Sequence, residues 1–132
     1  MAKKLISVFG LAFFLNWLWE ILHSQLYLHY RGQDITPAVL LRAAIVDAAL
    51  ITVLVFIAQK YSKKKSLFVI LTGLVLAVAI EKWALAAGRW AYGAAMPVIP
   101  ILQVGLTPTI QLAATGYITQ KLASINREKN AF

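Results

Sequence analysis

Acidic side chains interrupt three stretches of the sequence that are otherwise almost entirely apolar. Glu20 lies in NWLWEILHSQLY, Asp47 in VDAALI and Glu81 in AIEKWALA. A charge at mid-bilayer depth costs roughly 2.5–3.5 kcal/mol, so such residues face a protein interior, pair with one another or hold a proton. A carboxyl group in an apolar site is suited to general acid or base catalysis. Glu20, Asp47 and Glu81 are therefore candidate catalytic residues.

The first of these stretches carries its polar residues at helical spacing. At 100° per residue, Asn16, Glu20, His23 and Tyr27 fall within an arc of about 60°, which makes one polar stripe along a helix. An imidazole exchanges protons near neutral pH, so His23 is the candidate relay between the acids and the outer surface. Asn16 is a candidate substrate contact, and the alternative is that its amide only hydrogen-bonds a neighbouring helix.

The residues of GRWAY, together with Trp19, suit the binding of a lipid, isoprenoid or polyene substrate. The guanidinium of Arg89, with the phenol of Tyr92, is suited to holding a headgroup or a pyrophosphate. The ring faces of Trp19 and Trp90 are suited to stabilising a carbocation. The alternative for these four residues is anchoring at a membrane interface, where Trp, Tyr and Arg gather.

The last apolar stretch supplies a second polar stripe. Gln103, Thr107 and Gln111 cover an arc of about 80° on a helix and are candidate substrate-binding residues. Pro108 lacks a backbone donor and would free the carbonyl of Val104, so we expect the helix to kink beside this stripe.

The composition indicates which elements must position these residues. Of the 132 residues 61% are hydrophobic and 14% charged, where soluble domains have roughly 45–50% and 25%. Four stretches are long enough to cross a bilayer, which needs about 20 residues. Short connections make consecutive helices antiparallel neighbours. We therefore expect one all-α domain, an antiparallel bundle of four transmembrane helices over approximately residues 5–27, 37–57, 67–88 and 97–122.

Basic residues predict the orientation of this bundle. They gather before the first span, between the second and third, and after the fourth, at Lys3, Lys4, Lys60, Lys63, Lys64, Lys65, Lys121, Arg127 and Lys129. Loops rich in Lys and Arg stay on the cytoplasmic side. Both termini are thus predicted to be cytoplasmic, and the chain to be a multi-pass protein of the cytoplasmic (inner) membrane with an uncleaved signal anchor.

The depths of the polar residues predict that they meet. With a rise of about 1.5 Å per residue, the candidates on all four spans lie roughly 16–27 Å from the cytoplasmic edge. Adjacent spans run in opposite directions, so this agreement survives small errors in their boundaries. We expect one buried acidic site in the outer half of the bilayer.

Several motifs resemble those of a widespread group of small bacterial membrane proteins with four helices. The shared pattern is N-x-x-W-E, an Asp in the second helix, E-x-x-A-x-x-x-G-R-W-x-Y, M-P-x-x-P and G-L-x-P-x-x-Q. The resemblance extends over all four predicted helices and implies a shared site without implying a particular activity. The matching positions are Asn16, Trp19, Glu20, Asp47, Glu81, Gly88, Arg89, Trp90, Tyr92, Met96, Pro97, Pro100, Gly105, Leu106, Pro108 and Gln111.

More distantly, the run from Glu81 to Tyr92 is similar to the acid and G-x-W-x-Y rhythm of membrane carotenoid cyclases and hydratases. Those enzymes protonate or hydrate polyene double bonds within the bilayer. The resemblance implies a lipid or isoprenoid substrate of carotenoid-like character. The lycopene cyclase pattern has acids directly after its proline, whereas this chain reads PVIPILQ there.

Three functions fit these residues. The first is acid–base chemistry on, or binding of, a lipid or isoprenoid. The second is a small proton-coupled transporter that acts as a dimer, since four helices enclose little volume. The third is a structural or assembly role among membrane lipids. A flux assay and a lipid profile distinguish them.

Other classes are disfavoured. The formal net charge of +8 follows the loops rather than a nucleic-acid surface, so no nucleic-acid partner is expected. Glu20-x-x-His23 is half of a di-iron signature that needs a second Glu-x-x-His, whereas Glu81 is followed three residues later by Ala84. The chain has no cysteine, and we expect neither a metal nor a cofactor.

Overall fold

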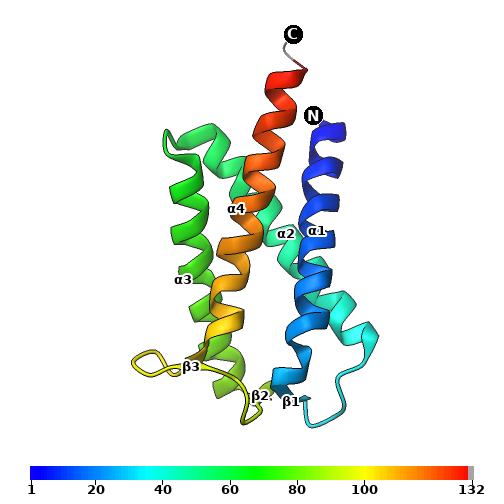
Figure 1. Cartoon of the computed structure of the whole chain (residues 1–132), viewed down its shortest axis with the longest axis vertical. Coiled ribbons are helices and arrows are strands. Elements are labelled where there is room, and N and C mark those ends of the chain that lie inside the picture. The colour runs from blue at the N-terminus through cyan, green and yellow to red at the C-terminus, as the bar shows by residue number, and fades with distance from the viewer. Residues whose placement is uncertain (131–132) are drawn as a thin grey trace.

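Four α-helices make up most of the fold in the computed structural model, which describes residues 1–130. The helices are α1 (Ala2–His23), α2 (Pro37–Tyr61), α3 (Lys65–Ala86) and α4 (Leu106–Lys129). They run lengthwise side by side, with both ends of the chain at one end of the bundle and short strands at the other (Figure 1). The expectation of an all-α fold is confirmed.

Local residues explain where the helices begin and end. The Thr36 hydroxyl accepts a hydrogen bond from the Val39 amide (3.4 Å) and caps α2, and Pro37 occupies the first helical position, where no donor is needed. Helix α3 ends at Ala86, and Gly88 follows with φ +67°, a conformation that glycine adopts without strain. A short 3₁₀ helix (Ser24–Leu26) extends α1.

Two short strands join the ends of α1 and α3. Strand β1 (Tyr27–Tyr30) pairs antiparallel with β2 (Trp90–Tyr92), and Tyr27 lies opposite Tyr92. The pairing places aromatic residues from distant parts of the sequence at the end of the bundle away from the termini. A second pair, β3 (Val98–Ile99) with β4 (Val104–Gly105), precedes α4.

Within the described residues, three helical segments are long and apolar enough to cross a membrane. They are α1 together with the 3₁₀ helix that extends it, α2, and α3. Helix α4 is comparable in length, with 24 residues, but is more polar. Part of the difference lies in buried hydroxyl and amide groups on the face turned to the other helices, at Thr109, Gln111, Thr115, Thr119 and Gln120. The rest lies in exposed charged residues in the C-terminal part of α4, at Lys121, Arg127, Glu128 and Lys129.

The predicted fourth span begins in the wrong place. Helix α4 starts at Leu106 rather than at Pro97, and the residues between form the β3–β4 hairpin. The Leu106 amide donates to the Pro97 carbonyl (2.7 Å), which closes this hairpin. Two prolines, Pro97 and Pro100, lack the donors that a continuous helix would need.

Close contact between α3 and α4 organises the core. A Cβ atom added to Gly73 would lie 3.0 Å from the Ala113 backbone nitrogen, and one added to Gly116 would lie 2.9 Å from a Val69 methyl group. Small residues at such crossings let two helix backbones approach closely. The fully buried side chains of Ile51 and Val55 from α2 complete this core near the α2–α3 connection.

Candidate functional site

A cavity of about 320 Å³ lies among the four helices, towards the end that carries β1 and β2. Its size is at the lower limit of typical small-molecule pockets. The side chains of Glu20, Asp47 and Glu81 all line it, so three helices each contribute a carboxyl group. Gln111 of α4 lines the same cavity.

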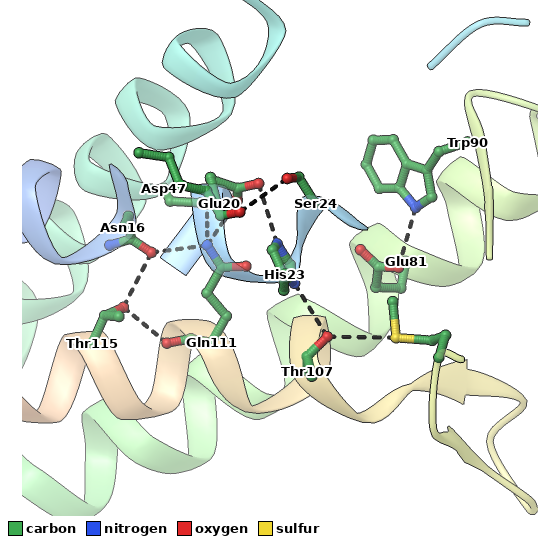
Figure 2. A network of polar contacts seen from close by, with 12 residues as sticks. Asn16, Glu20, His23, Ser24, Asp47, Glu81, Trp90, Thr107, Gln111 and Thr115 are labelled. Atoms are coloured by element: carbon green, nitrogen blue, oxygen red, sulfur yellow. Dashed lines mark hydrogen bonds and ion pairs between the residues drawn. The ribbon is translucent and has the colours of Figure 1, made fainter. Parts of the chain in front are cut away.

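The Gln111 amide connects three of the four helices. Its Nε2 atom lies 2.8 Å from Glu20 Oε1, 2.8 Å from Asp47 Oδ2 and 3.1 Å from Asn16 Oδ1 (Figure 2). An amide nitrogen carries two hydrogens, so these three acceptors share two donors. Asn16 is fully buried and also accepts from the Thr115 hydroxyl (3.2 Å).

Glu20 and Asp47 converge on one donor, since Glu20 Oε1 and Asp47 Oδ2 each lie 2.8 Å from the Gln111 amide nitrogen. The contact brings a carboxyl group of α1 and one of α2 together beside the N–H groups that α4 provides.

A chain of hydrogen bonds leads away from this pair. His23 Nε2 lies 3.2 Å from Glu20 Oε2, and His23 Nδ1 lies 3.1 Å from the Thr107 hydroxyl. That hydroxyl donates to the Met96 sulfur (3.4 Å), which leaves its oxygen free to accept from Nδ1. The imidazole thus contacts Glu20 through one nitrogen and the first turn of α4 through the other.

Glu81 is held from the side of β2. Its Oε2 atom accepts hydrogen bonds from the Tyr92 hydroxyl (2.6 Å) and from the Trp90 indole nitrogen (3.2 Å). The Tyr92 oxygen in turn accepts from the Gly105 amide (2.8 Å). Oε2 is therefore fixed by two donors, and Glu81 can act through its second oxygen.

Two tyrosines at this end have a perturbed acidity. Burial, together with the hydrogen bond to Glu81, raises the pKa of Tyr92. Burial, followed by the charge of Glu81, also raises the pKa of Tyr27, whose ring lies 5.6 Å from that of Tyr92. Both phenols thus keep their protons above the pH at which a free tyrosine loses one.

The structure brings most of the predicted site residues together. Those that line the cavity are Glu20, His23, Asp47, Glu81, Arg89, Trp90 and Gln111. Asn16, Thr107 and Tyr92 contact these residues by hydrogen bonds without lining the cavity themselves. They are placed to orient the lining residues rather than to touch an occupant.

Trp19 lies beside this network. Its ring centroid is 6.4 Å from that of His23 in an edge-to-face arrangement, and it does not line the cavity. Its buried indole nitrogen has no hydrogen-bond partner within the part of the chain that the structure describes. Its position fits packing against His23 better than contact with an occupant.

Two predictions for the fourth stretch are wrong. Gln103 is exposed in the turn between β3 and β4, with φ +54°, and shares no helical stripe with Gln111. Pro108 causes no kink beside the site, because it lies in the first turn of α4 and Val104 precedes the helix. The first four residues of a helix have no helical acceptor for their backbone N–H groups, so the N–H that Pro108 lacks costs α4 no hydrogen bond.

Sequence reasoning missed several residues that line the cavity, at His29, Tyr30, Arg42 and Trp83. Arg42 had a local signal, since Val39, Arg42 and Val46 recur at helical spacing on one face. No local signal in the sequence indicated the contribution of β1, because its pairing with β2 joins segments about sixty residues apart.

Groups of three or more His, Asp or Glu side chains arranged to hold a metal ion are absent from residues 1–130. Comparison of the chain with protein-family models, with curated proteins and with solved structures gives no match. The geometry of the cavity is therefore the basis for a functional proposal.

Proposed function

We propose that this chain is a multi-pass protein of the cytoplasmic membrane, with both termini in the cytoplasm and its cavity in the outer half of the bilayer. Three apolar helices and the basic connection between α2 and α3 support this orientation. The polar face of α4 is turned inwards, so this helix can cross the membrane inside the bundle despite its lower hydropathy.

Within this site, we propose acid–base chemistry on a lipid or isoprenoid substrate. The observation that carries the proposal is the convergence of Glu20, Asp47 and Glu81 on one cavity of mainly apolar lining. In residues 1–130, the one ion-pair contact of these acids is that of Glu20 with His23. Carboxyl groups that are neither neutralised by Lys or Arg nor exposed to bulk water are suited to proton transfer.

The contacts suggest a division of roles. The Glu20–Asp47 pair is the proton donor, since both carboxyl groups meet at the Gln111 amide and His23 can return a proton through Glu20 Oε2. Glu81 stabilises positive charge that develops on the substrate, since Tyr92 and Trp90 hold its carboxyl group in a fixed position. The ring of Trp90 lines the cavity and can contribute to the same stabilisation.

Proton-coupled transport is the second candidate. The chain from Glu20 through His23 to Thr107 favours it, because it offers protons a path towards one end of the bundle. The other half of the core is closed by buried apolar side chains, including Ile51, Val55 and Val69. A cavity that reaches only one half of the bundle suits a one-sided site better than alternating access, which in so small a chain would also need a second copy.

The test compares Glu20→Gln and Glu81→Gln with the parent chain in two assays. One is the lipid-extract profile of cells that depend on the protein, and the other is proton-coupled flux in vesicles. We expect both variants to change the lipid profile and leave flux unaltered. A change confined to flux would support transport, whereas no change in either assay would leave a structural role. Gln25→Glu, at an exposed position of the 3₁₀ helix, is the control.

A further inference from the structure

The cavity opens sideways between α2 and α3. Val46 of α2 and Trp83 of α3 both line it, and yet their side chains are 56% and 55% exposed on the surface of the bundle. A residue that lines a cavity and is also exposed marks the edge of an opening. These two residues stand on either side of the opening, which we call the α2–α3 portal.

The divergence of the two helices produces this portal. Residues 62–64 join α2 to α3, and near this connection Ala58 and Val69 are fully buried in a common core. Away from it, α2 crosses behind α4 and α1 while α3 keeps to the opposite side of the bundle (Figure 1). Val46 lies 15 residues before the last residue of α2 and Trp83 lies 18 residues after the first residue of α3, so both are far from the connection.

Two arginines line the cavity near the same end. Arg42 is exposed, and the guanidinium of Arg89 stacks over the Trp83 ring at 4.5 Å from its centroid. Stacking occupies the face of a guanidinium and leaves its N–H groups free at the edge. For the residues that the structure describes, neither arginine forms an ion pair with a carboxyl group. Such a pair is suited to an anionic group with several oxygens, such as a phosphate.

Charge therefore varies with depth in the cavity. Arg42 precedes Asp47 by five residues of α2, which is about 7.5 Å along a helix, and Arg89 lies just beyond the end of α3. The carboxyl groups are deeper, between apolar side chains such as Ala77, Ile80 and Leu112. An occupant that satisfies both levels has an anionic end near the arginines and an apolar chain beside the acids.

We infer that the ligand is a single-chain amphiphile with a phosphate-type headgroup, which enters from the bilayer through the α2–α3 portal. The inference rests on the proposed function, because the portal faces lipid only if the helices cross a membrane. The headgroup binds between Arg42 and Arg89, and the chain lies along the cavity past Val46 and Trp83. A position several bonds from the phosphate then faces Glu20, Asp47 and Glu81.

Binding of radiolabelled dodecyl phosphate to the full-length protein in phosphatidylcholine nanodiscs tests this inference, with empty nanodiscs as the blank. We expect saturable binding that Arg42→Gln and Arg89→Gln each weaken about tenfold or more, as the loss of a charge-assisted hydrogen bond implies. Lys82→Gln is the matched control, since Lys82 is exposed on α3 beside Trp83 and lies outside the cavity lining. Val46→Trp narrows the portal from an exposed position and should also weaken binding.

Competitors separate the sources of the phosphate group. Unlabelled dodecyl phosphate should compete, whereas inorganic phosphate and dodecanol, each alone, should not. Competition by inorganic phosphate at equal strength would overturn the inference in favour of a free anion. Binding that neither arginine variant weakens would overturn it as well.

The inference can fail separately from the proposed function. If the parent chain does not bind dodecyl phosphate but Glu81→Gln alters the lipid profile, the proposed phosphate headgroup is refuted and the acid–base site is retained. If binding depends on both arginines but the lipid profile of Glu81→Gln is unaltered, the inferred amphiphile site is retained and the proposed acid–base reaction is refuted.

Discussion

At the scale of single residues, the site depends on side chains that hold the carboxyl groups rather than on the carboxyl groups alone. Gln111 donates to Glu20 and to Asp47, and Tyr92 connects Glu81 to the Gly105 amide. Buried polar groups that lose such a partner keep the cost of their desolvation. Gln111 and Tyr92 are thus as important to the geometry as the acids.

Tyr92→Phe tests this dependence through pH. Because burial and Glu81 raise the pKa of Tyr92, the unfolded chain loses the phenolic proton above about pH 10 while the folded chain keeps it. The stability that Tyr92 contributes is therefore present below this pH and is lost as the pH rises further. The variant should be less stable at pH 8, by about 1–3 kcal/mol, and its melting temperature should fall less between pH 9 and 11.

The control for this measurement is Tyr61→Phe, at a tyrosine whose side chain is 74% exposed. Thermal unfolding of both variants in detergent gives the comparison. A Tyr92→Phe chain that follows the parent profile at every pH would contradict the contact with Glu81.

Residue spacing predicted part of this site for a physical reason. Asn16, Glu20 and His23 lie on one uninterrupted helix, so the helical repeat alone places them on one face. The prediction for Gln103 is wrong because the helical repeat does not extend through Pro97 and Pro100, where the chain forms the β3–β4 hairpin instead. Whether such a hairpin forms depends on tertiary contacts that periodicity does not contain.

At the scale of helices and strands, close packing on one side leaves space on the other. Gly73 and Gly116 let α3 and α4 approach until backbone and side chains touch. Helix α2 shares a buried core with α3 near their connection, at Ala58 and Val69, and the cavity lies towards the other end of the two helices. Trp83 was absent from the predicted site because its position at the cavity depends on the divergence of these two helices, which no local pattern encodes.

Gly73→Ala is expected to destabilise the bundle. The added Cβ would lie 3.0 Å from the Ala113 nitrogen and 3.1 Å from its Cα, and these backbone atoms cannot turn aside. The two helices must then separate, at a cost of about 1–3 kcal/mol. Thermal unfolding followed by circular dichroism measures the effect.

Gly10→Ala provides the matched control on α1, because a Cβ added there meets no atom within 4 Å. Alanine favours a helix by up to about 1 kcal/mol over glycine, so this variant should be equal to the parent or more stable. Equal melting temperatures for Gly73→Ala and the parent would contradict the close α3–α4 contact.

At the scale of the whole molecule, polarity is distributed unevenly along the bundle. The cavity, the β1–β2 pair and the carboxyl groups lie towards one end, whereas the termini and the lysine-rich connection lie at the other (Figure 1). The depths of the polar residues along helices that alternate in direction predicted a site at one end of the bundle, and the basic residues predicted that the lysine-rich connection lies with the termini. Both predictions tolerate errors in single boundaries, because each depends on many residues. The proposed membrane topology follows from the same distribution.

Single cysteines test this topology without interference, since the sequence contains none. Asp34→Cys, in the segment between β1 and α2, should react with a membrane-impermeant maleimide in intact cells. Lys63→Cys, in the α2–α3 connection, should react only after permeabilisation. Labelling of Lys63→Cys in intact cells, with protection of Asp34→Cys, would reverse the proposed orientation.

The proposed function requires that the cavity lined by Glu20, Asp47 and Glu81 holds a lipid-like molecule taken from the bilayer. Native mass spectrometry of the detergent-purified chain measures this directly, with Ala43→Phe as a variant that fills the cavity from α2. Ala38→Phe, at an exposed position of the same helix outside the cavity lining, is the control. We predict one retained amphiphile on the parent chain and on Ala38→Phe, and its loss from Ala43→Phe. A parent chain that carries no amphiphile, or an Ala43→Phe chain that retains it equally, would show that the cavity is not a lipid-binding site.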